Sequence, residues 1–364
     1  MDPADDLAPA LPVPGLDDVD CAPRHGRLRP FLVGAGLLAL GFVLLLLAGR
    51  PAPGSAPQPV PADAGAAIRS APAGRAAPPD AGPWDWPSDA WWRQIERTLA
   101  RLETRHLPLP APRSGEWLAE HRETGETFRQ YLEHRPFRPT AAAHTLYVVA
   151  LGELSPARQR VVDRTADYLQ DYYGLPVKRL PALPLSVVPA KAFRARDRGE
   201  RQIHSGTILA EVLAPRLPDD AAALIAFTAE DLFPAPSWNF VFGEASLHDG
   251  VGVWSLARLG YPDVNEVAFR RCLRRTLKIA AHEVGHMFGM LHCTAHYCVM
   301  NGVNSLVEND ATPLLPCPQC LAKTCWLTGR APRELLTRIE AITKAEGLDE
   351  DAKVAQRDLD ALDE

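Results

Sequence analysis

The longest apolar run in the chain extends from Phe31 to Gly49, nineteen residues without a charged or strongly polar side chain. As a helix it would be about 28 Å long, close to the hydrocarbon thickness of a bilayer. A cleaved signal peptide is the alternative, but the apolar core of such a peptide is usually only about 7–15 residues long. We therefore expect an uncleaved transmembrane helix over residues 31–49.

Basic residues flank this segment unequally, since Arg24, Arg27 and Arg29 precede it and only Arg50 follows closely. The flank that is richer in Lys and Arg usually stays in the cytoplasm. We therefore expect a single-pass membrane protein that contacts the lipid bilayer through this helix. Its residues 1–30 would be cytoplasmic and its main body extracytoplasmic.

Two further segments lack the pattern of a folded core. Residues 50–83 form a Pro/Ala-rich linker, with nine Pro, eleven Ala and four Gly between positions 51 and 83. This composition cannot bury enough apolar surface to offset the entropy of the chain. Residues 346–364 carry eight acids and two bases. We expect residues 347–364 to be a disordered acidic tail.

Between these segments the apolar positions become periodic. Residues 84–140 are expected to form a helical N-terminal part, because Ser88 suits an N-cap and apolar residues follow it at helical spacing (Trp92, Ile95, Leu99 and Leu102). A second helical stretch is expected around residues 117–132. These aromatic and aliphatic positions are typical of a core and indicate no chemistry.

Beyond residue 140, short apolar runs alternate with helical patterns. We expect strands over 145–151, 223–228, 238–242 and 251–255, and helices over 156–174, 203–217 and 263–290. This order predicts an α/β sandwich over residues 141–346, with one central sheet and a long helix.

Composition and charge narrow the possible partners. Hydrophobic residues make up 46% of the chain, which is enough to bury a core. The net charge is 39 − 45 = −6, and residues 346–364 alone contribute 2 − 8 = −6, so the remainder is neutral. Because nucleic-acid-binding proteins present a basic surface, we expect no nucleic-acid partner.

The candidate chemistry lies in the predicted helix 263–290, which ends in a histidine-rich sequence. His282 and His286 are four residues apart, so both imidazoles lie on one helical face and can bind one Zn²⁺. Glu283 follows the first of them and is placed to take a proton from metal-activated water as a general base. Solvated or otherwise satisfied histidines are the alternative.

Two residues, one at the end of this helix and one beyond it, strengthen the metal hypothesis. Gly289 can leave the helix in a left-handed conformation, so that His292 returns as a third ligand. Three protein ligands leave one position open, as in catalytic zinc sites. This spacing, followed by a Met-turn, is the metzincin signature, and Met300 lies in a turn-prone sequence. We expect Met300 to form a hydrophobic floor beneath the metal.

Four cysteines follow in two pairs, Cys293 with Cys298 and Cys317 with Cys320. Two close pairs of thiolates are typical of a closed, tetrahedral structural zinc site. Two disulfides are one alternative, and a redox pair at Cys317 and Cys320 is another. Cys325 is an alternative ligand.

These motifs resemble those of the archaemetzincins, a family of metzincin-like zinc peptidases with the pattern HExxHxxGxxHC, then CxM, then CxxC. The resemblance is clear over residues 140–345, including the segments 228–232 and 240–243, and weaker over residues 84–140. The motif positions in this chain are His282, Glu283, His286, Gly289, His292, Cys293, Cys298, Met300, Cys317 and Cys320. The chain departs from the family in its anchor and linker, because typical members look soluble and intracellular.

The resemblance implies a zincin/metzincin-like fold with a central mixed sheet, a long active-site helix and a Met-turn. It also implies two zinc ions per chain. The three histidines would hold a catalytic zinc with Glu283 as general base, and the four cysteines a structural zinc. We therefore expect a membrane-anchored zinc metallopeptidase that hydrolyses peptide bonds in a peptide or protein substrate. A non-catalytic, zinc-stabilised peptide-binding module and a thiol–disulfide protein that uses Cys317 and Cys320 are the alternatives.

Overall fold

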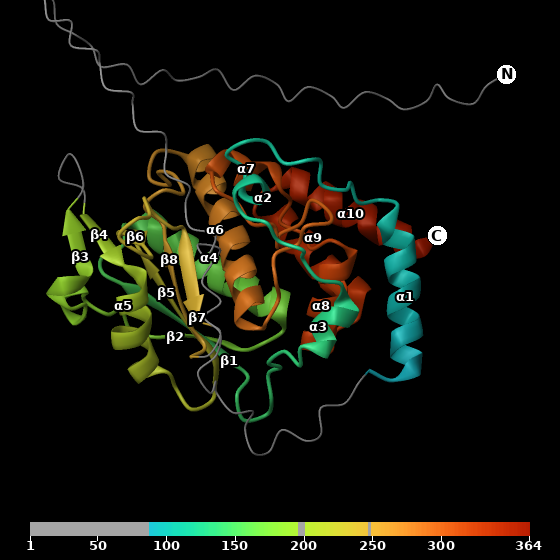
Figure 1. The fold of residues 1–364 in the computed structure, drawn as a ribbon, viewed down its shortest axis with the longest axis horizontal. Helices are drawn as coiled ribbons and strands as arrows, with labels where there is room; N and C mark the ends of the chain where they lie inside the picture. The colour runs from blue at the N-terminus through green and yellow to red at the C-terminus, as the bar shows by residue number, and fades with distance from the viewer. Residues whose placement is uncertain (1–86, 196–200, 247–248) are drawn as a thin grey trace, which may run out of the picture. The chain divides into compact units, whose positions relative to one another are not determined.

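The computed structural model describes residues 87–195, 201–246 and 249–364 (Figure 1). The apolar segment 31–49, its flanks and the linker 50–83 lie outside these residues. Within the described part of the chain, no helix is both long enough and apolar enough to cross a bilayer.

A five-stranded sheet in the order β2-β1-β5-β8-β7 lies at the centre of the fold (Figure 1). β7 runs antiparallel to β8, whereas the other neighbouring strands are parallel. The prediction of a central mixed sheet is therefore confirmed. Its strands are β1 (Thr145–Leu151), β2 (Val177–Arg179), β5 (Ala221–Thr228), β7 (Gly243–Ser246) and β8 (Val251–Ser255).

Both faces of this sheet are covered. Alternate residues of β1, such as Leu146 and Val148, pack in a core shared with α4 (Pro156–Tyr173) and α6 (Glu266–Met287). The residues between them, Tyr147 and Val149, pack on the opposite face in a second core. Burial on both faces explains why the strands appear in the sequence as continuous apolar runs.

Local signals define the two long helices. The Ser155 hydroxyl accepts a hydrogen bond from the Arg158 backbone N–H (3.3 Å), Pro156 occupies the first turn, and Gly174 ends α4 with φ +66°. The predicted bounds of α4 are confirmed. α6 begins later than predicted, because the Asn265 side chain accepts the Ala268 N–H and serves as the N-cap.

The helix predicted over 203–217 is wrong at its start. Ile203 belongs to β4 and is buried opposite Phe193 of β3 and Leu232 of β6, and this sheet pairing overrides the helical pattern. A second sheet is formed by β3 (Phe193–Ala195), β4 (Arg201–His204) and β6 (Asp231–Phe233). The short helices around it are η1 (Leu185–Val187), η2 (Ala190–Ala192), α5 (Ser205–Thr207), the π-helical η4 (Ile208–Leu213) and η5 (Ala214–Arg216).

The strand predicted over 238–242 is also wrong, and β7 begins only at Gly243. Backbone carbonyls of this segment accept hydrogen bonds from side chains instead of from a neighbouring strand. The Arg194 guanidinium donates to the Trp238 carbonyl (2.6 Å), and the Gln202 amide donates to the Asn239 carbonyl (2.8 Å).

The N-terminal part contains α1 (Asp89–Glu103), α2 (Trp117–Glu120) and α3 (Phe128–Glu133). Ser88 caps α1 as predicted, since its hydroxyl accepts the Trp91 N–H at 3.3 Å. The stretch expected to be helical around 117–132 is two short helices, and α3 begins at a capping box formed by Thr127 and Gln130. The residues between α2 and α3 pass beside the histidines described below.

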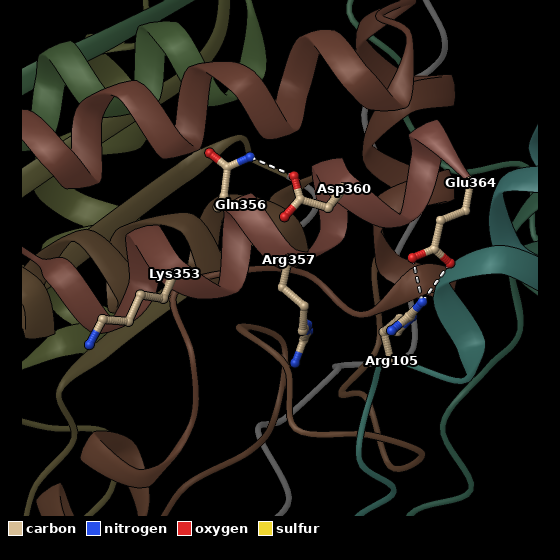
Figure 2. Close-up of a pocket in the computed structure, with 6 residues that line it drawn as sticks. All are labelled: Arg105, Lys353, Gln356, Arg357, Asp360 and Glu364. Carbon is tan, nitrogen blue, oxygen red and sulfur yellow. Dashed lines mark hydrogen bonds and ion pairs between the residues drawn. The ribbon is translucent and has the colours of Figure 1, made fainter.

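The prediction of a disordered tail over 347–364 is wrong. The C-terminal helices are α7 (Leu306–Ala311), α8 (Pro318–Thr328), α9 (Pro332–Ala345) and α10 (Asp349–Asp363). α10 buries an apolar stripe that includes Ala355 and Leu359, and its acidic residues are divided between two environments. Asp351 binds the Arg274 guanidinium at 2.6 Å in the interior. Figure 2 shows the outer face, where Asp360 accepts from Gln356 on the same helix. The prediction of disorder rested on the many acidic residues of this segment, but their spacing leaves one apolar face that the helix buries.

Candidate metal centre

α6 presents His282 and His286 on one face, one helical turn apart. Gly285 lies between them and has Met300 directly against it, since a Cβ atom there would come within 2.6 Å of the Met300 sulfur. The glycine therefore makes room for the methionine against α6, between the two histidines along the helix. The role of Met300 as a hydrophobic floor beneath a metal stays a prediction.

The ring nitrogens of these histidines have defined roles. Nδ1 of His282 lies 3.0 Å from the Val299 carbonyl, and Nδ1 of His286 lies 2.6 Å from the Met290 carbonyl. Because a carbonyl only accepts, each Nδ1 carries the proton and each Nε2 keeps its lone pair. Burial and the neighbouring imidazoles hold the pKa of His282 well below its usual range and lower that of His286 to about 3. Both rings are therefore neutral.

His292 completes the group as predicted. Gly289 takes φ +83° after α6, and the chain turns back so that nitrogens of His282, His286 and His292 all lie within 4.8 Å of one another. On its other side, Nδ1 of His292 lies 2.9 and 3.0 Å from the two carboxylate oxygens of Glu123. Each of the three rings is thus held by a bond at Nδ1.

This donor set fits a zinc ion. The Nε2 atoms of His282 and His286 are 2.9 Å apart, yet neither has a proton to share. Two facing lone pairs repel each other unless a cation lies between them, and nitrogen ligands of tetrahedral zinc stand about 3.3 Å apart. Imidazoles oriented by carbonyls and a carboxylate are the usual surroundings of such an ion.

Glu283 lies beside the first histidine and is partly buried. Its burial, together with the nearby charge of Glu244 on β7, raises the pKa of the Glu283 carboxyl to about 8. A carboxylate with a raised pKa accepts a proton more readily at neutral pH. A dication nearby would favour its ionised form.

The turn that contains Met300 is held by the polypeptide around it. The Met300 carbonyl accepts the Cys293 N–H (2.8 Å), which ties the turn to the residue after His292. The Asn301 side chain accepts the Cys298 N–H (2.7 Å) and donates to the carbonyls of Cys293 (2.7 Å) and His296 (2.9 Å). A single buried amide therefore fixes the cysteine loop and the turn together.

The sulfur atoms of Cys293, Cys298, Cys317 and Cys320 lie within 4.8 Å of one another, and all four residues are buried. Cys293 and Cys317 are 3.5 Å apart, far beyond the ~2.05 Å of a disulfide, and all described cysteines are free. Four sulfurs in this arrangement fit a tetrahedral zinc ion. Cys325 lies outside the group.

The geometry does not favour a redox role for Cys317 and Cys320. Cys317 stands at the N-cap of α8 with no exposed surface, whereas a thiol that exchanges with another protein must be reached by it. The backbone N–H groups of Met300 and Cys317 point at the Cys298 sulfur at 3.4 and 3.1 Å. Such donors favour a thiolate ligand.

Sequence reasoning missed the residues that reach this centre from the N-terminal part, chiefly Glu123 and Trp117. The Trp117 ring packs edge-on against His292, with 5.0 Å between ring centres. Glu123 is separated from His292 by 169 residues and belongs to no motif. No local pattern could have found either residue.

Comparison with known proteins identifies the group to which this arrangement belongs. Residues 145–325 match the sequence pattern of Peptidase family M54. Archaemetzincin-2 of Macaca fascicularis is 34% identical over 253 residues, which cover 59% of this chain and 68% of that protein. The chain belongs to the archaemetzincin family. It is therefore a zinc metallopeptidase.

Other archaemetzincins are also similar to this chain. The human archaemetzincin-2 has the same identity and coverage, and the Pyrococcus furiosus archaemetzincin is 32% identical over 180 residues, or 49% of this chain and 91% of that one. The crystal structure of archaemetzincin from Methanopyrus kandleri aligns over 53% of this chain and 99% of its own, with 29% identity and a TM-score of 0.41. The prediction of an archaemetzincin is confirmed.

Proposed function

We propose that this archaemetzincin hydrolyses peptide bonds at a zinc ion held by His282, His286 and His292. The observation that carries the proposal is the convergence of three ring nitrogens within 4.8 Å, two of them unprotonated and facing each other. When bound, zinc supplies Lewis acidity that polarises a carbonyl and acidifies water. Peptides or proteins are the substrates that a peptidase family implies.

Glu283 is the proposed general base. It would take the proton from the attacking water and pass it to the leaving amine. Its position next to His282 and its raised pKa support this role. Because its neighbours bury it in part, the carboxylate is partly shielded from the bulk water that would compete for the proton.

The experiment is the substitution Glu283→Ala in the zinc-replete full chain. We expect unchanged zinc content and a loss of hydrolysis of more than about 100-fold, the low end for a general base. Glu266→Ala is the matched control, since Glu266 is an exposed glutamate at the start of the same helix. Hydrolysis that survives in Glu283→Ala would overturn the mechanism. Wild-type peptide binding without hydrolysis would instead support a non-catalytic binding module.

We propose that Cys293, Cys298, Cys317 and Cys320 hold a second, structural zinc. Their burial, their mutual approach and the N–H groups aimed at Cys298 support this ligand set. Because Cys293 follows His292 directly, such an ion would fix the position of the third histidine. Treatment with a thiol reagent tests it: the four thiols should react only after a chelator removes zinc.

We also propose that residues 31–49 anchor the protein in a membrane, with its catalytic part extracytoplasmic. The length of the apolar run and the three arginines before it support this topology. The full chain should then stay in membranes during alkaline extraction, and protease added to the outer side should digest the catalytic part. Release by alkali, or protection from the protease, would contradict the anchor or its orientation.

A further inference from the structure

The segment from Trp117 to Glu126 lies against the loop that carries the third histidine. It contacts this loop at three successive places. Glu123 binds the His292 ring, the Thr294 hydroxyl donates to the Thr124 carbonyl (3.2 Å), and Glu126 accepts the Leu291 backbone N–H (2.9 Å). These contacts bracket His292 on both sides.

The support of His292 differs in kind from that of the other two histidines. His282 and His286 donate to backbone carbonyls, which are neutral, whereas His292 donates to the Glu123 carboxylate. Nδ1 of His292 lies 2.9 and 3.0 Å from the two carboxylate oxygens, so the carboxylate holds the ring with both of its oxygens. A carboxylate behind an imidazole fixes the ring and raises its basicity toward a metal.

We infer that Glu123 is a positioning residue for the metal centre, which holds His292 in the ligand geometry and strengthens its bond to zinc. The inference rests on the proposed histidine zinc site. It assigns part of the centre to residues that precede the M54 match, which begins at residue 145.

Neighbouring residues make Glu123 a fixed rather than a mobile partner. The Lys323 ammonium on α8 binds the Glu126 carboxylate at 3.0 Å, and both side chains are almost fully buried. Gly125 takes φ +62°, and a Cβ atom there would lie 2.5 Å from the Thr294 hydroxyl oxygen. The segment therefore turns tightly against the loop and is anchored to the helix that carries Cys320.

Trp117 closes the same region from the other side. Its side chain is 7% exposed, and its ring occupies the space beside Gly302, where a Cβ atom would come within 2.4 Å of the indole. Because the indole also packs on His292, it limits access of water to this side of the ring. A hydrogen bond made by that ring is stronger where water is excluded.

The test measures zinc retention by the full chain against increasing concentrations of a chelator, with thiol reactivity as a report on the cysteine site. For Glu123→Ala we expect one zinc to be lost at a chelator concentration about 10–100-fold lower than in the wild type. The four thiols should stay unreactive there, because their zinc is untouched. Glu123→Gln should lose its zinc at a chelator concentration between those of the wild type and Glu123→Ala, since the amide oxygen still accepts a hydrogen bond from the His292 ring.

Glu133→Gln is the matched control, an exposed glutamate at the end of α3 in the same N-terminal part. It should retain zinc like the wild type. Cobalt substitution adds a second readout, because the spectrum of cobalt on the histidines should change in Glu123→Gln and not in the control. If Glu123→Ala fails to fold, Glu123→Gln decides.

Wild-type chelator resistance and an unchanged cobalt spectrum in Glu123→Gln and in any folded Glu123→Ala would overturn the inference. That outcome would leave the proposed function intact if the wild type still cuts peptides. Conversely, a wild type that binds zinc but cuts no peptide would sink the proposed function and leave the positioning role of Glu123 standing.

Discussion

The Asp358 carboxylate lies 3.0 Å from Nε2 of His106, although 252 residues separate them along the chain. Their side chains are only 1% and 4% exposed. Asp358 belongs to α10 and His106 follows α1, so the pair joins the two ends of the described structure. The last helix is therefore part of the folded unit.

We predict that Asp358→Ala lowers the free energy of unfolding by about 3 kcal/mol, because removal of one member of a buried pair leaves the other without a partner. Urea unfolding of the zinc-replete protein measures it. Asp360→Ala, an exposed position on the same helix, should change stability by less than about 0.5 kcal/mol. Equal effects of the two variants would show that α10 is not docked as described.

Lys278 introduces a pH dependence of stability. Its ammonium is buried on α6 and donates to the Thr312 carbonyl (2.6 Å) and hydroxyl (2.7 Å), and burial lowers its pKa to about 7. An unfolded lysine has a pKa near 10.4, so between about pH 7 and 10 the unfolded state holds a proton that the folded state lacks. Stability from this residue therefore rises with pH, by about 1.4 kcal/mol per unit.

We predict that Lys278→Met removes this slope. Relative to the wild type, the variant should be most stable at pH 7. This advantage should decrease by pH 9, because the stability of the wild type rises with pH and that of the variant lacks this contribution. Urea unfolding at pH 7, 8 and 9 measures the difference, and Lys344→Met on α9 is an exposed control. A difference that stays constant with pH would contradict the prediction.

Gly289 offers a test of how the third histidine is placed. Its φ of +83° costs any other residue about 1–2 kcal/mol, and a Cβ atom would also lie 3.1 Å from Pro136. We predict that Gly289→Ala loses this stability and also binds zinc more weakly at the histidines. Gly115→Ala is the control, since Gly115 has φ +87° with open space around it. It should lose similar stability with unchanged zinc affinity, and equal zinc loss in both would refute the assignment.

The sequence predicts well those features that depend on neighbours along the chain. The spacing of His282 and His286, the left-handed Gly289 and the caps of α4 are local, and the structure reproduces them. The cysteine group is also found, because its two pairs have short spacings. In each case the signal lies in short spacings along the chain, although the fold has to bring the two cysteine pairs together.

Features that depend on packing between residues far apart along the chain could not be predicted from the sequence. Glu123 reaches His292 across 169 residues, and no periodicity marks it. The last helix looks like a solvated tail because its acids dominate the composition, yet Asp351 and Asp358 are buried against Arg274 and His106. Ile203 has a helical pattern around it, but strand pairing on both sides decides its conformation.

The most direct test of the central claim is the zinc content of the purified full chain by mass spectrometry, together with a count of reactive thiols. We predict two zinc ions per chain, with Cys293, Cys298, Cys317 and Cys320 unreactive. One zinc with two disulfides would keep the histidine site and remove the cysteine site. A zinc-free protein after metal-replete preparation would contradict the account, because the histidines would then not form a metal centre.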